Sequence, residues 1–242
     1  MATLYEYYNT GDDDAYTRYG SYWAAQTFTP STAHKITSVK LKLFRVGSPG
    51  TITVSIRATF GGKPTGGDLC VGTTDGNSLT TSTAGEWREI TLGAGYNLNA
   101  FTKYAIVVRA TSGDGANLFQ WRWDGSSPTY EEGNAAVSSN SGSLWDGYTE
   151  WDFMFEDWGE EIPVDPPTVT TQAVDDILPT TATGNGNMTD NGGENASKRG
   201  VCWNTTGNPT VMATLYEYYN TGDDNKSPIS NIEWGAQSFT PT

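Results

Sequence analysis

The stretch VKLKLFRVGSPGTITVSIRAT, residues 39–59, decides the fold class of this chain. Apolar and polar side chains alternate over residues 39–43 and again over residues 52–58. A period of two is the pattern of a half-buried β-strand. Residues 47–50, Gly-Ser-Pro-Gly, are turn formers. The stretch therefore predicts two strands of an antiparallel sheet joined by a turn.

The same pattern recurs through the first two thirds of the chain, with Gly-rich or Asp-Gly turns between the runs. Further strands are expected at Thr3–Asn9, Trp23–Thr29, Leu69–Thr73, Trp87–Leu92, Tyr104–Ala110, Leu118–Trp123 and Trp151–Trp158. The 242 residues include 28 Gly and 11 Pro, and only 17% are charged, a composition poor in helix formers. We therefore expect an all-β protein whose residues 1–160 form an antiparallel jelly-roll β-sandwich.

Residues 161–167 contain three prolines and two acids, and this segment is expected to be an extended linker. Beyond it, strands are expected at Thr168–Ala173, Thr180–Met188 and Lys198–Asn204. Three strands bury too little apolar surface to be stable alone. Residues 168–211 are therefore expected to form an incomplete sheet, to be completed by residues 212–242, by another copy of the chain or by sequence outside it.

The chain contains an internal repeat. Residues 1–13 and residues 212–224 both read MATLYEYYNTGDD, and the offset of 211 holds through Pro30 and Pro241, while residues 14–22 and 225–233 differ. Residues 212–242 thus repeat residues 1–31, either as part of a longer array or as strands that serve another sheet. The side chains expected to mediate self-assembly are Leu215, Tyr216, Tyr218, Trp234 and Phe239.

Two resemblances to known families follow from quoted segments. RGVCW at residues 199–203 resembles fibronectin type III-like modules of large secreted bacterial surface proteins, and this resemblance implies that residues 168–211 form a partial immunoglobulin/fibronectin-like β-sandwich. AQTFTP at residues 25–30, GTITVSIR at 50–57 and YAIVV at 104–108 are similar to jelly-roll repeats of bacterial, archaeal and phage surface proteins. Some of these repeats are called choice-of-anchor domains, and they resemble carbohydrate-binding modules. The resemblance implies display and adhesion at a cell surface or virion.

The charge of the chain excludes several partners. With 14 Lys and Arg against 28 Asp and Glu, the formal charge is −14 at pH 7. Such a surface repels nucleic acid and anionic membranes. No apolar run reaches the roughly 18 to 20 residues of a membrane span. We expect no membrane insertion and an extracellular location, with any export signal outside this chain.

The residues do not assemble into a catalytic motif. The single histidine, His34, follows Ser31, Thr32 and Ala33 and is expected on a surface turn. Among the acids that end the first domain, Asp152 and Glu156 alternate with Trp151, Phe153 and Phe155 on a strand, which predicts a solvent face opposite a core face; the other acids of this cluster are Glu150, Asp157, Glu160 and Glu161. We therefore expect no enzymatic activity.

Calcium is the one cofactor that the residues suggest. Asp12, Asp13 and Asp14 concentrate hard oxygen ligands in one loop, and residues 223–225 nearly repeat them. The alternative is an acidic turn exposed to solvent.

A row of aromatic residues suggests glycan binding. Phe119, Trp121 and Trp123 project from one face of a single strand, where flat rings can stack on sugars. Polar anchors would come from Asn117, Arg122 and Asp124, and further rings from Trp23 or Trp145. The alternative, that this face is the core, stays open at this point.

The sequence thus favours a structural or adhesive subunit of an extracellular fibre, built from β-sandwich modules that self-associate through strand exchange. A carbohydrate-binding module on the stalk of a surface protein is the alternative.

Overall fold

The computed structural model describes residues 2–163, 165–179, 182–192, 232–233 and 237–239. The chain divides into two compact units, Met1–Ile162 and Pro163–Thr242. The described residues form antiparallel strands and one short 3₁₀ turn, Gly76–Ser78. The prediction of an all-β, antiparallel sandwich is confirmed. Nothing in the described part of the chain is a helix long and apolar enough to cross a membrane.

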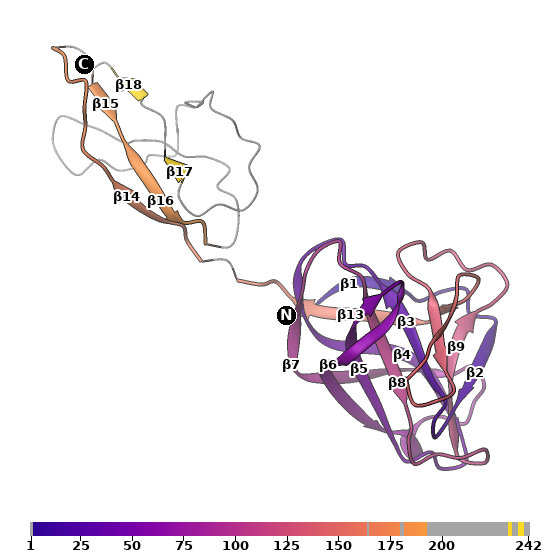
Figure 1. Ribbon diagram of the computed structural model, residues 1–242. Helices are drawn as coiled ribbons and strands as arrows, with labels where there is room; N and C mark the ends of the chain where they lie inside the picture. The colour runs from indigo at the N-terminus through magenta and orange to yellow at the C-terminus, as the bar shows by residue number, and fades with distance from the viewer. Residues whose placement is uncertain (1, 164, 180–181, 193–231, 234–236, 240–242) are drawn as a thin grey trace. The chain divides into compact units, whose positions relative to one another are not determined.

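The first sheet of unit 1, here called sheet A, has seven strands (Figure 1). They are β1 (Thr3–Tyr8), β2 (Asp14–Arg18), β4 (His34–Val46), β7 (Glu86–Leu98), β9 (Leu118–Asp124), β12 (Asp152–Phe153) and β13 (Phe155–Glu160). Their order is β1-β13-β4-β9-β12, with β2 added on β9 and β7 on β4. The long strand β4 organises the sheet, because residues 35–41 pair with β13 and residues 43–46 pair with β9.

The second sheet of unit 1, sheet B, has six strands in the order β11-β10-β3-β8-β5-β6. They are β3 (Trp23–Phe28), β5 (Thr51–Phe60), β6 (Lys63–Asp75), β8 (Tyr104–Arg109), β10 (Ala135–Ser138) and β11 (Asp146–Tyr148). Lys63 at one edge of this sheet lies against Gly147 at the other edge, so the sheet is strongly curled. All nine strands expected in the first unit are found, although the expected strand Trp151–Trp158 is divided into β12 and β13; β2, β10 and β11 are additional.

The main core lies between the two sheets. Its largest fully buried side chains are Trp121, Phe28, Phe119, Phe153, Phe155, Ile36, Leu41, Leu43, Ile52, Ile56, Ile90 and Leu92. The rings of Trp121 and Phe153 stack with centroids 4.5 Å apart. Burial of each such side chain stabilises the fold by about 1.5–3 kcal/mol. The alternating apolar residues of 39–43 and 52–56 point into this core, as their period predicts.

The outer edges of the two sheets meet at a glycine. Strands β6 of sheet B and β7 of sheet A run close together, and a Cβ on Gly72 would lie 2.0 Å from the carbonyl oxygen of Thr91. No other residue type has room there. Gly72 therefore permits the sandwich to close along this side.

Sheet B also buries side chains on its second face. Ala25, Ala105, Val107 and Ala136 are at most 1% exposed and pack with Trp145 in a separate cluster. Small residues on the concave side of a curled sheet leave room for the loop that carries Trp145. The sequence pattern did not predict this second cluster, because a two-layer sandwich ordinarily exposes the outer face of each sheet.

In the described part of unit 2 the strands are short. They are β14 (Thr168–Thr171), β15 (Ala182–Gly184), β16 (Gly186–Asp190), β17 (Ile232–Glu233) and β18 (Gln237–Phe239). The expected strand Thr180–Met188 is divided into β15 and β16, and the expected strand Lys198–Asn204 lies outside the described residues. Strands β17 and β18 come from the repeated segment, and they pair with β16 and β15.

These pairings bear on what completes the second sandwich. Backbone from residues 232–233 and 237–239 of the same chain contributes to the two described sheets of this unit. Of the side chains expected to mediate self-assembly, Leu215, Tyr216, Tyr218 and Trp234 lie outside the described residues, and Phe239 is described by its backbone alone.

Candidate functional site

The loop between β1 and β2 packs against the end of β9. The amide of Asp13 donates to the carbonyl of Trp123 over 3.1 Å, and Asp14 is paired with Trp123 in the sheet. Gly11 has a φ of +94°, a left-handed conformation that glycine adopts without strain, and this turn brings the loop onto Asp124. The structure thus brings the predicted calcium ligands and part of the predicted glycan site together.

Asp12 is the counter-ion of two cations. Its carboxylate accepts from Nζ of Lys42 at 2.8 Å and from Nε of Arg122 at 2.7 Å. Burial acts to raise the pKa of Asp12, but the hydrogen bonds and charges of Lys42 and Arg122 outweigh it and hold the pKa below its usual value. Because its lone pairs face two cations, Asp12 is not placed to bind calcium.

The calcium prediction is therefore wrong at Asp12, and at Asp13 and Asp14 it stays a prediction. Within the described ranges, no three acidic, histidine or cysteine side chains are grouped as metal ligands. Arg122 is likewise committed to Asp12, so it is not a free anchor for a sugar.

Asp13 and Asp14 instead line an open surface pocket of about 340 Å³. Its other lining residues are Trp123, Gly125 and Ser126. The Ser126 side chain and the Gly125 amide hold the pKa of Asp13 below its usual value, and Asp14 accepts from the amide of Ala15 at 2.7 Å. The pocket therefore offers two carboxylates and a hydroxyl beside a small exposed part of an indole.

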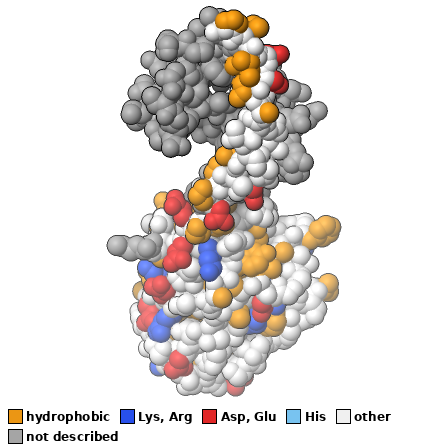
Figure 2. Space-filling model, turned by 90° about the vertical axis from the view of Figure 1, so that its left-hand side faces the viewer, with side chains coloured by type: hydrophobic (Ala, Val, Ile, Leu, Met, Phe, Trp, Pro, Cys, Tyr) orange, Lys and Arg blue, Asp and Glu red, His pale blue; other side chains and the backbone are white. Residues whose placement is uncertain are grey.

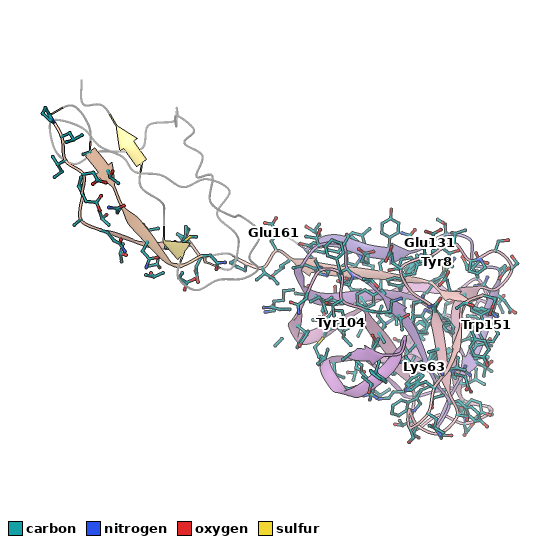
Figure 3. The ribbon with its side chains drawn as sticks, turned by 45° about the horizontal axis from the view of Figure 1, so that its top comes forward. Tyr8, Lys63, Tyr104, Glu131, Trp151 and Glu161 are labelled. Carbon is teal, nitrogen blue, oxygen red and sulfur yellow. The ribbon has the colours of Figure 1, made fainter. Side chains whose placement is uncertain are left out.

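Asp124 is buried beneath this pocket and is 4% exposed. The hydroxyl of Tyr8 donates to its Oδ2 over 2.7 Å, and the amides of Ser126 and Ser127 donate to its Oδ1. Figure 3 shows Tyr8 beside the loop that carries Glu131. Asp124 thus fixes β1 and a loop to the sheet, and the prediction that it anchors a ligand is corrected.

Three of the four predicted stacking tryptophans belong to the interior, and the fourth, Trp23, is partly buried. Trp121 is fully buried and its Nε1 donates to the carbonyl of Met154 over 2.8 Å, while Trp123 and Trp145 are each 8% exposed. A Cβ on Gly125 would lie 2.7 Å from the Trp123 ring, so backbone covers that ring. The aromatic face of β9 is the core face, and stacking of a sugar on Trp121 is excluded by burial.

His34 is also buried, whereas the sequence predicted a surface turn. Its Nε2 lies 2.9 Å from Oδ2 of Asp157 and its Nδ1 lies 2.9 Å from the carbonyl of Thr32. Tyr5 of β1 stacks on the imidazole, with centroids 3.7 Å apart and planes within 3°. Both ring nitrogens face acceptors, so the geometry suits an imidazolium paired with a carboxylate.

The pKa values of His34 and Asp157 are both higher in the folded protein than in the unfolded chain. Burial acts to lower the pKa of His34, but Asp157 outweighs it and the pKa is raised. Burial raises the pKa of Asp157, and the bond from His34 offsets this in part.

Asp152 is 2% exposed, accepts from Gln26 and from the amide of Tyr130, and has its pKa raised by burial to about 6. The predicted solvent-facing position is therefore wrong at Asp152. Phe153, Met154 and Phe155 are all fully buried, so the alternation is interrupted between β12, which pairs with β9, and β13, which pairs with β4.

A cluster on the second face of sheet B was missed from the sequence. Asp68 accepts from Arg57 at 2.7 Å and from Arg109 at 2.6 Å, and both guanidinium groups lie over the ring of Trp23, at 5.5 and 5.0 Å from its centroid. The sequence signal for this cluster was one arginine in each of two largely apolar strands, Arg57 in β5 and Arg109 in β8. The cluster covers the small buried residues of that face.

Arg18 is a second buried cation, 6% exposed, that the sequence analysis did not single out. Its guanidinium lies 3.7 Å from the centroid of the Tyr16 ring, and its Nη1 donates to the carbonyl of Thr17. Burial lowers the pKa of Arg18 to about 10. Neither Nε nor Nη2 has a hydrogen-bond partner among the described residues.

No protein-family model matches the sequence of this chain, and no curated protein matches it significantly.

Proposed function

We propose that this chain is a non-enzymatic structural or adhesive module of an extracellular fibre, on a cell surface or a virion, assembled from β-sandwich units. The observation that carries the proposal is the use of the duplicated segment. Residues 237–239, the copy of residues 26–28 in β3, pair with β15 of the second unit instead of forming part of a first-unit sandwich. Residues 26–28 and their copy, residues 237–239, thus supply strands to two different sandwiches, as expected of a protein whose units share strands.

The chemistry of the first unit supports a structural role. The groups that could act as acid and base, His34 and Asp157, are both fully buried and bonded to each other. Figure 2 shows acidic and basic side chains interspersed on the visible face of this unit, among apolar and neutral ones. Polar networks at Asp12, Asp124 and Asp68 hold strands together. These are the features of a rigid spacer.

The test compares the purified full chain with a chain that ends at Val211. We expect filaments or long oligomers from the full chain, by negative-stain imaging and multi-angle light scattering, and none from the shorter one. Monodisperse monomers from both chains over a wide concentration range would overturn the proposal.

A carbohydrate-binding module is the second candidate, and the pocket at Asp13, Asp14, Trp123 and Ser126 favours it. Carboxylates beside an aromatic edge can bind sugar hydroxyls. Affinity electrophoresis against a panel of polysaccharides tests it. We expect a ligand to retard the native chain and an Asp14→Ala variant to lose retardation, with exposed Asp146 changed to Ala as the matched control. Equal mobility of the native chain on every polysaccharide would exclude this candidate.

A further inference from the structure

The first strand and its acidic loop form a self-contained docking element. We propose that residues 212–224 of one copy bind the β1 site of a second copy, on β13 and beside the end of β9, in place of that copy's own residues 1–13. This inference rests on the proposed function and names its partner and its contact surface.

The contacts of the N-terminal element come from few side chains. Tyr5 stacks on His34, the Glu6 carboxylate accepts from the amide of Ser31 at 2.8 Å, and the Asn9 amide donates to Glu156 over 3.0 Å. Tyr8 donates to Asp124, Asp12 pairs with Lys42 and Arg122, and Asp13 accepts from the amide of Gly125 at 3.0 Å. Gly11 supplies the left-handed turn between them.

Every one of these side chains is present in the second copy. At the offset of 211 they are Tyr216, Glu217, Tyr219, Asn220, Gly222, Asp223 and Asp224. Identity ends at Asp14, which is Asn225 in the copy. Asp14 is exposed, and its side chain accepts from the amide of the next residue. The repeat is therefore identical over residues 1–13, which include every side chain named above, and it differs from Asp14 onward, where β2 pairs with β9.

The edge of sheet A is the place at which an occupant can be exchanged. No residue of β1 is fully buried, and Tyr7 is 52% exposed. Among the described strands, β1 lies at the end of sheet A and pairs with β13. Edge strands are the positions at which sheets recruit strands from other chains. Removal of β1 uncovers the His34 ring, on which Tyr5 stacks, and the core residues against which Tyr8 packs, so an incoming copy must supply both tyrosines.

The native β1 and the incoming copy make the same contacts, so their relative local concentrations decide which of them occupies the site. A chain's own β1 is present at an effective concentration on the order of mM. The second copy of a neighbouring chain is therefore expected to occupy the site at comparable local concentrations, such as those within a fibre, or when the native β1 is weakened.

Cysteine cross-linking tests this placement. Tyr7 and Glu156 are direct partners in the β1–β13 pair, and opposite residues in an antiparallel pair have Cα atoms about 4.5–5.5 Å apart, within disulfide range. In a background where Cys70 and Cys202 are changed to Ala, Tyr7→Cys with Glu156→Cys gives the intramolecular reference bond. Tyr218→Cys with Glu156→Cys is the test, and Asn225→Cys with Glu156→Cys is the control for register.

The expected result of mild oxidation is a ladder of covalent oligomers on a non-reducing gel from the Tyr218 pair, and none from the Asn225 pair. Changing both Tyr5 and Tyr8 to Ala should increase the ladder several-fold, because it weakens the native β1. The same changes at Tyr216 and Tyr219 should abolish it. Light scattering of the two tyrosine variants without added cysteines should give a larger mass for the first.

Three outcomes would overturn the inference. The first is the absence of a ladder from the Tyr218 pair under conditions where the Tyr7 reference disulfide forms, and the second is a disulfide between positions 218 and 156 within one chain only. The third is an equal mass in light scattering for the variant changed at Tyr5 and Tyr8 and the variant changed at Tyr216 and Tyr219. Imaging of the same samples separates this failure from failure of the fibre proposal. Filaments without the Tyr218–Glu156 bond would keep the fibre and refute this contact, whereas the bond without filaments would keep the contact and refute the fibre.

Discussion

The buried pair of His34 and Asp157 gives the sharpest test of the structure. Changing Asp157 to Ala removes the carboxylate 2.9 Å from Nε2 and leaves a fully buried imidazole without its counter-charge. Breaking a buried ion pair by removing one partner costs about 3–5 kcal/mol. A domain of this kind is stable by only about 5–15 kcal/mol. The change should therefore remove a large share of the stability of the first unit.

The measurement is urea unfolding at pH 6, followed by tryptophan fluorescence. Asp157→Asn is the matched control, because it keeps the volume and can hydrogen-bond to a neutral imidazole, so its cost should be clearly smaller. A cost below about 1 kcal/mol for Asp157→Ala would refute the buried ion pair, since exposed substitutions fall in that range.

The pH dependence of stability tests the same pair independently. The pKa of His34 is raised in the folded state above its ordinary value of 6.5. The stabilisation is therefore complete below pH 6.5, where both states carry the proton, and is lost as pH rises through the folded pKa. The loss is at most about 1.4 kcal/mol per pH unit for one proton. His34 is the only histidine of the chain, so its NMR titration is read without assignment. A folded pKa below 6.5, or an equal slope in Asp157→Asn, would contradict this account.

Three further predictions follow from other contacts. Asp12→Ala should destabilise unit 1 by about 2–3 kcal/mol in urea unfolding, because it removes charge-assisted bonds to Lys42 and Arg122. The control is Asp14→Ala at an exposed position, which should change the free energy of unfolding by less than about 0.5 kcal/mol. Equal effects of the two changes would refute the role of Asp12 as counter-ion of two cations. Gly72→Ala should lower the melting temperature strongly, because its Cβ would meet the carbonyl of Thr91 at 2.0 Å, while Gly67→Ala has open space and should not. Trp121→Ala truncates a core side chain and should lower the free energy of unfolding by about 3–5 kcal/mol. At a temperature where the variant is folded, its electrophoretic mobility on any polysaccharide that retards the native chain should be unchanged. Loss of retardation by the folded variant would restore the hypothesis that sugars stack on Trp121.

The strands of the first unit could be predicted because alternation is local. Residues 39–43 and 52–58 reveal their period within a few positions, and the same rule located all nine expected strands. The repeat was equally plain, since identity over residues 1–13 and 212–224 needs no structure. Turn chemistry at residues 47–50 fixed where two strands end.

The candidate site depended on contacts that are distant in sequence. Tyr8 reaches Asp124 across 116 positions, and Arg122 reaches Asp12 across 110. A loop of three acids looks the same in the sequence whether it faces calcium, solvent or two cations, and only the position of β4 and β9 beside it decides.

Burial of polar groups was likewise decided by the tertiary structure. Alternation identifies two faces of a strand, but it does not say which face is covered when a sheet curls or a bulge shifts the register. The sequence predicted surface positions for His34 and Asp152, and each is at most 2% exposed in the fold. A buried charge is tolerated only where a partner from another strand meets it, and such partners are fixed by strand order and register, which local sequence does not encode.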